Sequence, residues 1–235
     1  MINLKNEVIK EIVNTLLVQD SESRLLFLQS INNESGEGTQ NSRYIQMWDY
    51  RYNNILEISK RFGLKSIKIG RGKLWEAILV LGPENELYVF FSKTNLKRII
   101  RHGKDNHYLR LLNLFNQEFD EMEPLSSQLT LPIFHEEAEK KDDLKNQARE
   151  MLHMMETEPT KVIVFAFDTS FFSTVEAYVF NSKNELVMEK DLTEFIDVNY
   201  HSVLKHDNLQ PDKRESSISY ETKTEKKRIV KLKNS

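Results

Sequence analysis

Apolar positions recur at helical spacing through the first quarter of the chain. The pattern predicts a helix over residues 3–18 and a second helix that begins at the capping pair Asp20-Ser21 and continues to Ile31. The polar stretch 32–42 has no apolar period, so we expect an exposed loop there. A third helix with an inward apolar and aromatic face follows and ends at Gly63, a residue type suited to a helix C-cap. Its inward members are Ile45, Trp48, Tyr52, Ile55, Leu56 and Phe62.

Two stretches in different halves of the chain, residues 75–94 and 175–193, share one pattern. Each begins with Glu-Ala and an apolar run, continues through a turn that leads into Asn-Glu-Leu, and closes with a second run. Runs rich in Val, Tyr and Phe around a short polar turn predict two β-hairpins of similar design. The first copy is one residue longer, and we assign the extra residue to its turn. Internal duplication and a chance likeness of two hairpins both account for the pattern.

The remaining periodicity predicts strands and helices around these hairpins. Residues 65–69 alternate polar and apolar, as a half-exposed strand does, whereas 162–167 form an unbroken apolar run typical of a strand buried on both faces. An edge strand is predicted at 129–134, where Pro132 removes one ladder hydrogen bond. Helices are predicted over 94–102, from Asp105 or Asn106 to Phe115, and over 136–155.

Together these elements predict an α+β protein with N-terminal helices and two β-hairpin units packed with amphipathic helices. The pattern leaves open whether the two hairpins share one sheet. Composition and pattern divide the chain into an N-terminal helical segment and loop (1–42), a basic helix and hairpin unit (43–116), an acidic connector with a helix (117–160), a second β unit (161–204) and a polar, basic tail (205–235).

Composition narrows the classes of function. The chain has 235 residues, 39% of them hydrophobic and 29% charged, as is usual for a soluble protein. With seven glycines and no Gly-rich phosphate loop, a nucleotide cofactor is not expected. With no cysteine, thiolate zinc sites and disulfides are excluded, and no cofactor or metal is assigned. Charges interrupt every apolar run near the N-terminus, so we expect a cytoplasmic protein with no membrane contact.

The net charge of −3 conceals a segregation along the sequence. Residues 43–110 carry a net charge of +8, and residues 111–160 carry −8. One interpretation is a phosphate-binding surface in the first half. The other is that the acidic segment lies over the basic one and neutralises it within the fold. Charge alone does not separate the two.

The basic residues of the first unit form a candidate contact surface for a protein or a nucleic acid. Glycines beside cations near residues 70–73 would let a phosphate approach the backbone, although the same tetrapeptide suits an ordinary basic turn. We expect the cations of the strand and its edge loop to lie on one side of the sheet. The members of the predicted surface are Lys65, Lys68, Arg71, Lys73, Lys97, Arg98 and Arg101.

A catalytic alternative rests on Arg101 and His107. An Arg, an intervening polar residue and a His six positions after the Arg resemble the motif of HEPN-type ribonucleases. The resemblance implies a metal-independent ribonuclease in which His107 acts as acid or base and Arg101 stabilises the charged phosphorane. HEPN domains are helical throughout, whereas this motif follows a predicted β-hairpin. An ordinary exposed basic turn accounts for the same residues.

A second catalytic alternative rests on Asp168, which ends the predicted buried strand. A strand ending in Asp-Thr-Ser before a hairpin is similar to the opening of the ribonuclease H-like and the sugar-kinase/actin-like folds, where such an Asp holds Mg²⁺. The resemblance implies a metal-dependent, nuclease-like enzyme. Glu176 and Glu189 lie on neighbouring predicted strands, but the pattern does not fix their faces. The structural interpretation is an Asp that caps its own turn.

The overall pattern adds a family resemblance. The stretch from Trp48 to Asn116, together with VFAFDTSFF and VEAYVFN in the second β unit, resembles an uncharacterised family of small proteins carried by Gram-positive bacteria and their mobile elements. This resemblance implies no known activity. It favours a role in conflict between a host and a phage or plasmid, performed by stoichiometric binding.

The leading hypothesis is therefore a non-enzymatic, cytoplasmic protein that binds a macromolecule through the basic surface. The ribonuclease and metal-dependent hypotheses are the enzymatic alternatives. A third hypothesis places the contacts on the acidic connector and the tail. Edge strands leave homodimerisation by sheet extension open.

Overall fold

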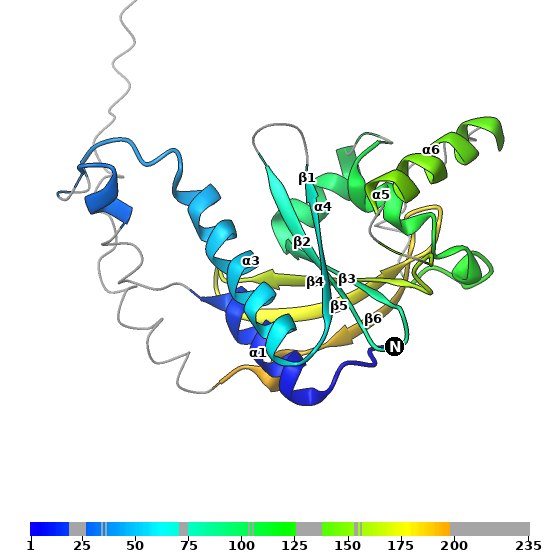
Figure 1. The fold of residues 1–235 in the computed structure, drawn as a ribbon, viewed down its shortest axis with the longest axis horizontal. Helices are drawn as coiled ribbons and strands as arrows, with labels where there is room; N and C mark the ends of the chain where they lie inside the picture. Colours follow the sequence, from blue (N-terminus) through cyan, green and yellow to red (C-terminus); the bar gives the residue numbers. More distant parts are fainter. Residues whose placement is uncertain are drawn as a thin grey trace, which may run out of the picture.

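A computed structural model describes residues 1–18, 27–33, 35, 37–70, 75–102, 104, 106–125, 138–152, 155 and 157–197 (Figure 1). Its helices are α1 (Asn6–Leu17), α3 (Arg43–Arg61), α4 (Lys93–His102), α5 (Tyr108–Asn113), α6 (Ala138–Met151) and the short 3-10 helices η1 (Gln117–Phe119) and η3 (Thr193–Phe195). Its strands are β1 (Lys65–Gly70), β2 (Glu76–Leu81), β3 (Leu87–Ser92), β4 (Val162–Asp168), β5 (Thr174–Phe180) and β6 (Leu186–Asp191).

All the described strands belong to one six-stranded sheet in the order β1-β2-β3-β4-β5-β6. Neighbouring strands are antiparallel except for β3 and β4, which are parallel. The sheet thus consists of two three-stranded antiparallel meanders, β1-β2-β3 and β4-β5-β6, which meet at the parallel pair β3 and β4. The fold is α+β, as predicted, and both hairpins lie in this sheet (Figure 1).

Helices cover both faces of the sheet. On one face, Phe167 of β4 contacts Trp48 of α3. On the other face, Ala166 of β4 lies beside its partner Glu176 of β5. The Glu176 carboxylate binds Lys93 of α4. Because successive strand residues point to opposite faces, α3 and α4 lie on opposite sides of the sheet. The central strands β3 and β4 are buried along nearly their whole length, which explains their unbroken apolar runs.

The two hairpin turns have the same construction. The Gly82 N–H donates to the Glu86 carbonyl at 2.8 Å, and the Asn181 N–H donates to the Glu185 carbonyl at 2.9 Å. Asn85 and Asn184 occupy the left-handed region, with φ values of 64° and 65°. The prediction of a longer first turn was wrong, because the turns are equal in length. The ladder between β5 and β6 instead has a register shift at Val179 and Phe180.

The glutamate of the first Asn-Glu-Leu explains why glycine opens that turn. The Glu86 side chain is fully buried and accepts hydrogen bonds from the Glu84 N–H at 2.8 Å and the Tyr88 hydroxyl at 3.1 Å. A Cβ atom at Gly82 would lie 2.7 Å from the Glu86 carboxyl carbon. Any larger residue at position 82 would displace the carboxylate that holds the turn.

The ribbon formed by β1 and β2 separates from β3 after two residue pairs. Strand β2 pairs with β3 only at Val80–Tyr88 and Leu81–Leu87, whereas β1 and β2 pair along their full length. Past the point of separation, Trp75 contacts Tyr52 of α3 and Tyr108 of α5, with ring centroids 6.1 Å apart in each pair. Aromatic side chains therefore join the diverging ribbon to helices from both faces.

The third predicted helix is α3, and its C-terminus is confirmed. Gly63 has φ +68°, and its N–H donates to the Lys60 carbonyl while the Leu64 N–H donates to the Ser59 carbonyl, which is the Schellman arrangement. Tyr52 packs inward as expected. The prediction for Ile45 was wrong, since it is 48% exposed beside Tyr44 at 81%.

Several predicted elements fall wholly or partly outside the described residues. Residues 27–30 are helical, but the predicted start of the second helix is not described. The predicted edge strand at 129–134 and the tail at 205–235 also lie outside. Within the described part of the chain, no helix has the length and apolar character needed to cross a bilayer.

Candidate functional site

Helix α4 carries the most basic exposed surface among the predicted site residues. It follows β3 directly, and the Ser92 hydroxyl accepts a hydrogen bond from the Asn95 N–H at 3.3 Å. Its inner face is buried through Leu96, Ile99 and Ile100. Its outer face exposes three cations, and none of them forms an ion pair with another described residue. These are Lys97, Arg98 and Arg101.

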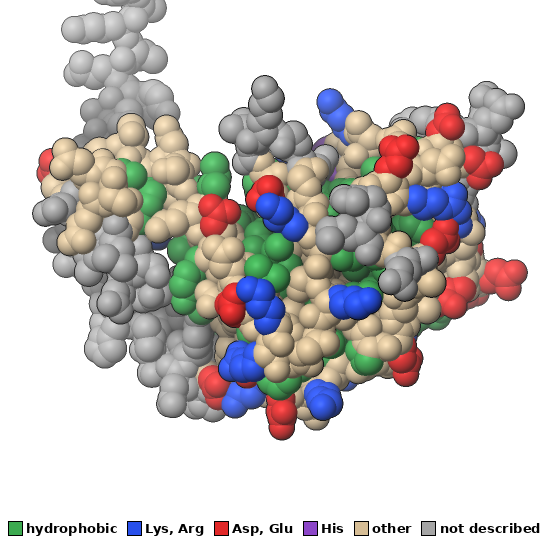
Figure 2. Space-filling view, in the orientation of Figure 1, with side chains coloured by type: hydrophobic (Ala, Val, Ile, Leu, Met, Phe, Trp, Pro, Cys, Tyr) green, Lys and Arg blue, Asp and Glu red, His purple; other side chains and the backbone are tan. Residues whose placement is uncertain are grey.

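The strand part of the predicted basic surface does not form one side of the sheet. Lys65 and Lys68 are three positions apart in a regular strand, so they point to opposite faces and the prediction was wrong. Lys68 is also paired with Glu76 at 3.1 Å. Acidic and basic side chains are intermixed on the face shown in Figure 2. Arg71 and Lys73 lie outside the described residues.

Lys65 lies at a separate hollow of about 440 Å³. The start of α1, the end of α3 and the turn between β2 and β3 line this hollow. The Asn3 N–H donates to the Tyr88 hydroxyl at 3.2 Å beside it. This position separates Lys65 from α4, which packs on β3 and β4.

Arg101 and His107 lie on either side of the connection between α4 and α5. Arg101 is exposed in the last turn of α4. His107 is the N-cap of α5, and its Nδ1 atom accepts a hydrogen bond from the Leu109 N–H at 3.2 Å. Its ring stacks on Tyr108 with centroids 4.8 Å apart. His107 therefore has a structural role at a helix terminus, and the surrounding sheet differs from an all-helical domain.

Asp168 ends β4 and caps the turn that follows. Its Oδ1 atom accepts hydrogen bonds from the Ser170 N–H at 2.9 Å and the Ser170 hydroxyl at 2.7 Å. The bond from the hydroxyl is the main cause that lowers the pKa of Asp168, and the positive charge of Lys93 acts in the same direction. The structural interpretation of this residue is thus confirmed.

The structure brings the three carboxylates of the metal hypothesis to one face of the sheet. Asp168 pairs with Thr174, and Glu176 and Glu189 flank Tyr178 on the same face. Lys93 Nζ binds a Glu176 oxygen at 2.6 Å and donates to the Thr174 hydroxyl at 2.8 Å. Among the described residues, no group of three or more potential ligands converges closely enough for a metal ion.

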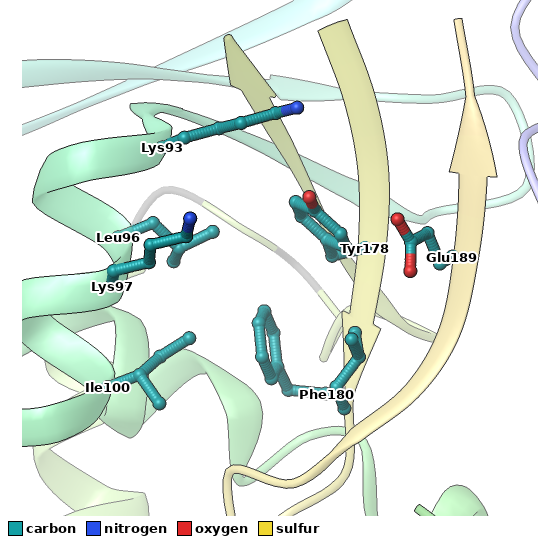
Figure 3. A pocket seen from close by; sticks show the side chains of 8 residues that line it. Lys93, Leu96, Lys97, Ile100, Tyr178, Phe180 and Glu189 are labelled. Atoms are coloured by element: carbon teal, nitrogen blue, oxygen red, sulfur yellow. The ribbon is translucent and has the colours of Figure 1, made fainter. Parts of the chain in front are cut away.

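A pocket of about 170 Å³ lies between α4 and the second hairpin (Figure 3). Apolar side chains from both walls form most of its lining, while Lys97 and Glu189 project from opposite walls (Figure 3). The lining residues are Lys93, Leu96, Lys97, Ile100, Tyr178, Phe180, Leu186 and Glu189.

Tyr178 connects the pocket to the Lys93–Glu176 ion pair. Its hydroxyl donates to a Glu176 oxygen. Burial is the main cause that raises the pKa of Tyr178, and the hydrogen bond and negative charge of Glu176 add to it. The phenol therefore stays protonated and serves as a donor at neutral pH. Sequence reasoning missed Lys93 and Tyr178, although Tyr178 shares the period-two alternation of Glu176 and Phe180.

The fold and site define an α+β protein with a continuous mixed sheet, a basic helix on one face and a small pocket beneath that helix. The chain belongs to a family of unknown function, DUF5986, whose pattern matches residues 3–235. This agrees with the resemblance to an uncharacterised family. Neither the curated proteins nor the solved structures contain a match.

Proposed function

We propose that this protein is a non-enzymatic binding protein that contacts the phosphate backbone of a nucleic acid through the outer face of α4. The observation that carries the proposal is the exposure of Lys97, Arg98 and Arg101 on one helix without ion-pair partners among the described residues. Cations that have no ion-pair partner in the described part of the chain are available to displace counterions from phosphates. Because no base-reading motif accompanies them, the binding is directed at the backbone.

The test compares two triple variants in fluorescence-anisotropy titrations with labelled single-stranded RNA and duplex DNA. Lys97→Gln/Arg98→Gln/Arg101→Gln removes three charges from α4. The control Lys10→Gln/Lys60→Gln/Arg61→Gln removes the same charge from ion-paired residues on α1 and α3. The wild type should bind with affinity that falls steeply with salt, and the α4 variant should reduce the slope of log K against log[salt] by about 2–3.

Two results would contradict the proposal. One is binding that is absent or independent of salt in the wild type. The other is an equal loss of affinity in the α4 variant and the control, since that would reflect net charge rather than a site.

The ribonuclease alternative makes a different prediction from the same titration. If Arg101 and His107 form a catalytic pair, the labelled RNA should shorten over time, and His107→Ala should abolish the shortening. Cleavage that persists in His107→Ala removes this alternative. Because His107 caps α5, the variant's thermal unfolding must be measured beside its activity.

A cytoplasmic role in conflict between a host and a phage or mobile element extends the proposal. Such a role can be performed by stoichiometric binding, without a catalytic step. Affinity capture from host cells with and without nuclease treatment tests the extension. A partner protein that remains after nuclease treatment would shift the contact from nucleic acid to protein.

A further inference from the structure

The pocket beneath α4 combines an apolar lining with three charged side chains, those of Lys93, Lys97 and Glu189. Leu96 and Ile100 come from the helix wall, and Phe180 and Leu186 come from the hairpin wall. The pocket volume of about 170 Å³ is close to that of an apolar cavity of ~150 Å³ that accommodates benzene. The apolar part of a ligand in this pocket is therefore limited to a short branched chain or one small ring.

Of the three charged side chains, only that of Lys93 is already neutralised by an ion pair within the described part of the fold. Lys93 is 14% exposed and is paired with Glu176, which is 21% exposed. In contrast, Lys97 and Glu189 form no ion pair with any described residue. They line the pocket from different walls, Lys97 from α4 and Glu189 from β6, and the Tyr178 side chain lies between them in Figure 3.

This arrangement selects among ligand classes. A simple carboxylate would be attracted by Lys97 but repelled by Glu189. A simple amine would be attracted by Glu189 but repelled by Lys97. A neutral apolar molecule would leave both charges partly desolvated without a partner. A small zwitterion with an apolar body satisfies both charges and fills the space below them.

We propose that the pocket binds a free α-amino acid with a branched aliphatic side chain, of which leucine is the test case. The ammonium group binds the Glu189 carboxylate, the carboxylate binds the Lys97 ammonium, and the side chain lies against Ile100 and Phe180. This inference does not require nucleic-acid binding, although Lys97 takes part in both proposals. Its test contains no nucleic acid, so the two proposals fail separately.

Isothermal titration of the protein of residues 1–235 with leucine tests the proposal directly. Isoamylamine and isocaproate, which lack the carboxylate and the ammonium group respectively, serve as single-charge analogues. Leucine should bind, and each analogue should bind at least about tenfold more weakly, because one charge-assisted hydrogen bond is lost. An analogue that binds as well as leucine would overturn the zwitterion assignment, and so would the absence of leucine binding at millimolar concentration.

Variants locate the site. Glu189→Gln and Lys97→Gln should each lower leucine affinity about tenfold. Lys190→Gln is the matched control, because Lys190 is exposed on β6 but pairs with Ala177 and points to the other face. The exchange Lys97→Glu/Glu189→Lys should recover affinity relative to Lys97→Glu alone. Unchanged leucine affinity in Glu189→Gln would overturn the proposal, because the protein would then bind leucine elsewhere.

Discussion

Lys93 and Glu176 form an ion pair of 2.6 Å that joins the first turn of α4 to β5, across the boundary between the two meanders. Both side chains are largely shielded from water. Removal of one partner would therefore leave a poorly solvated charge. The pair also orients the Tyr178 hydroxyl, which donates to the same carboxylate. It therefore links the helix that forms one wall of the pocket to the hairpin that forms the other.

The first prediction concerns this ion pair. Lys93→Met or Glu176→Gln should lower the free energy of unfolding by about 1–3 kcal/mol, measured by urea denaturation. The exposed pair Lys68–Glu76 is the control, and Lys68→Met should cost about 0–1 kcal/mol. A double-mutant cycle in which the Lys93 and Glu176 effects simply add would show that the pair has no coupling energy.

The second prediction concerns the left-handed asparagines of the turns. Asn85→Ala should destabilise by about 1 kcal/mol more than Asn85→Gly, because only Ala has a Cβ that opposes positive φ. Asn54 in α3 is the control. There Asn54→Gly should be less stable than Asn54→Ala, since glycine destabilises a helix interior relative to alanine. Equal unfolding energies for Asn85→Ala and Asn85→Gly would contradict the role assigned to backbone conformation.

These turns show what the sequence could predict and what it could not. The repeated Asn-Glu-Leu identified both hairpins, because turn chemistry is local. The position of the extra residue was assigned wrongly, because a register shift within a ladder depends on the partner strand. The same limit applies to Glu176 and Glu189. Their strands were predicted, but the face they share was fixed only by the pairing of β4, β5 and β6.

The apolar spacing of α3 predicted its buried face correctly in the middle of the helix but not in its first turn. Gly63 identified the end of α3 through its conformational freedom, and Tyr52 was assigned to the core correctly. Ile45 has the same spacing but lies in the first turn of α3, where it remains exposed. The pocket was not predictable at all, because it requires the placement of α4 over a hairpin eighty residues later in the sequence.

The third prediction concerns Asn116, a buried residue that sequence reasoning overlooked. Its amide donates to the carbonyls of Val162 at 3.0 Å and Phe180 at 2.6 Å, and accepts from the Val162 N–H at 2.7 Å. Asn116→Ala should cost roughly 3 kcal/mol or more, since several buried backbone groups lose their partners at ~1–3 kcal/mol each. Asn54→Ala, which removes a bond to a carbonyl in the same helix, should cost far less. Similar unfolding energies for the two variants would refute the bridging role.

The fourth prediction concerns pH. The pKa of Asp168 is lowered in the folded protein, so its stabilising contribution is present above the unfolded value of about 3.9 and is lost as pH falls through the folded value. NMR titration should show a higher Asp168 pKa in Ser170→Ala, which removes the hydroxyl donor. The difference in thermal stability between wild type and Asp168→Asn should shrink as pH falls below about 4. An unchanged Asp168 pKa in Ser170→Ala would exclude the hydroxyl as the cause.

The fifth prediction concerns Phe171 and Phe172, which are 95% and 82% exposed in the loop between β4 and β5. The bond between Lys93 and Thr174 places the end of this loop beside the start of α4. Exposed rings next to a basic helix provide stacking platforms for unpaired bases. Phe171→Ser/Phe172→Ser should therefore weaken binding to single-stranded RNA in the anisotropy titration and leave duplex DNA binding unchanged.

The loss should amount to about 1–3 kcal/mol for each base that stacks. The free energy of unfolding should change by no more than about 0.5 kcal/mol, because neither ring is packed against the core. Phe171→Tyr/Phe172→Tyr is the matched control, since it keeps both aromatic faces and should retain affinity. If the serine and tyrosine variants bind single strands equally well, the rings do not contact bases, and α4 alone supplies the nucleic-acid contact.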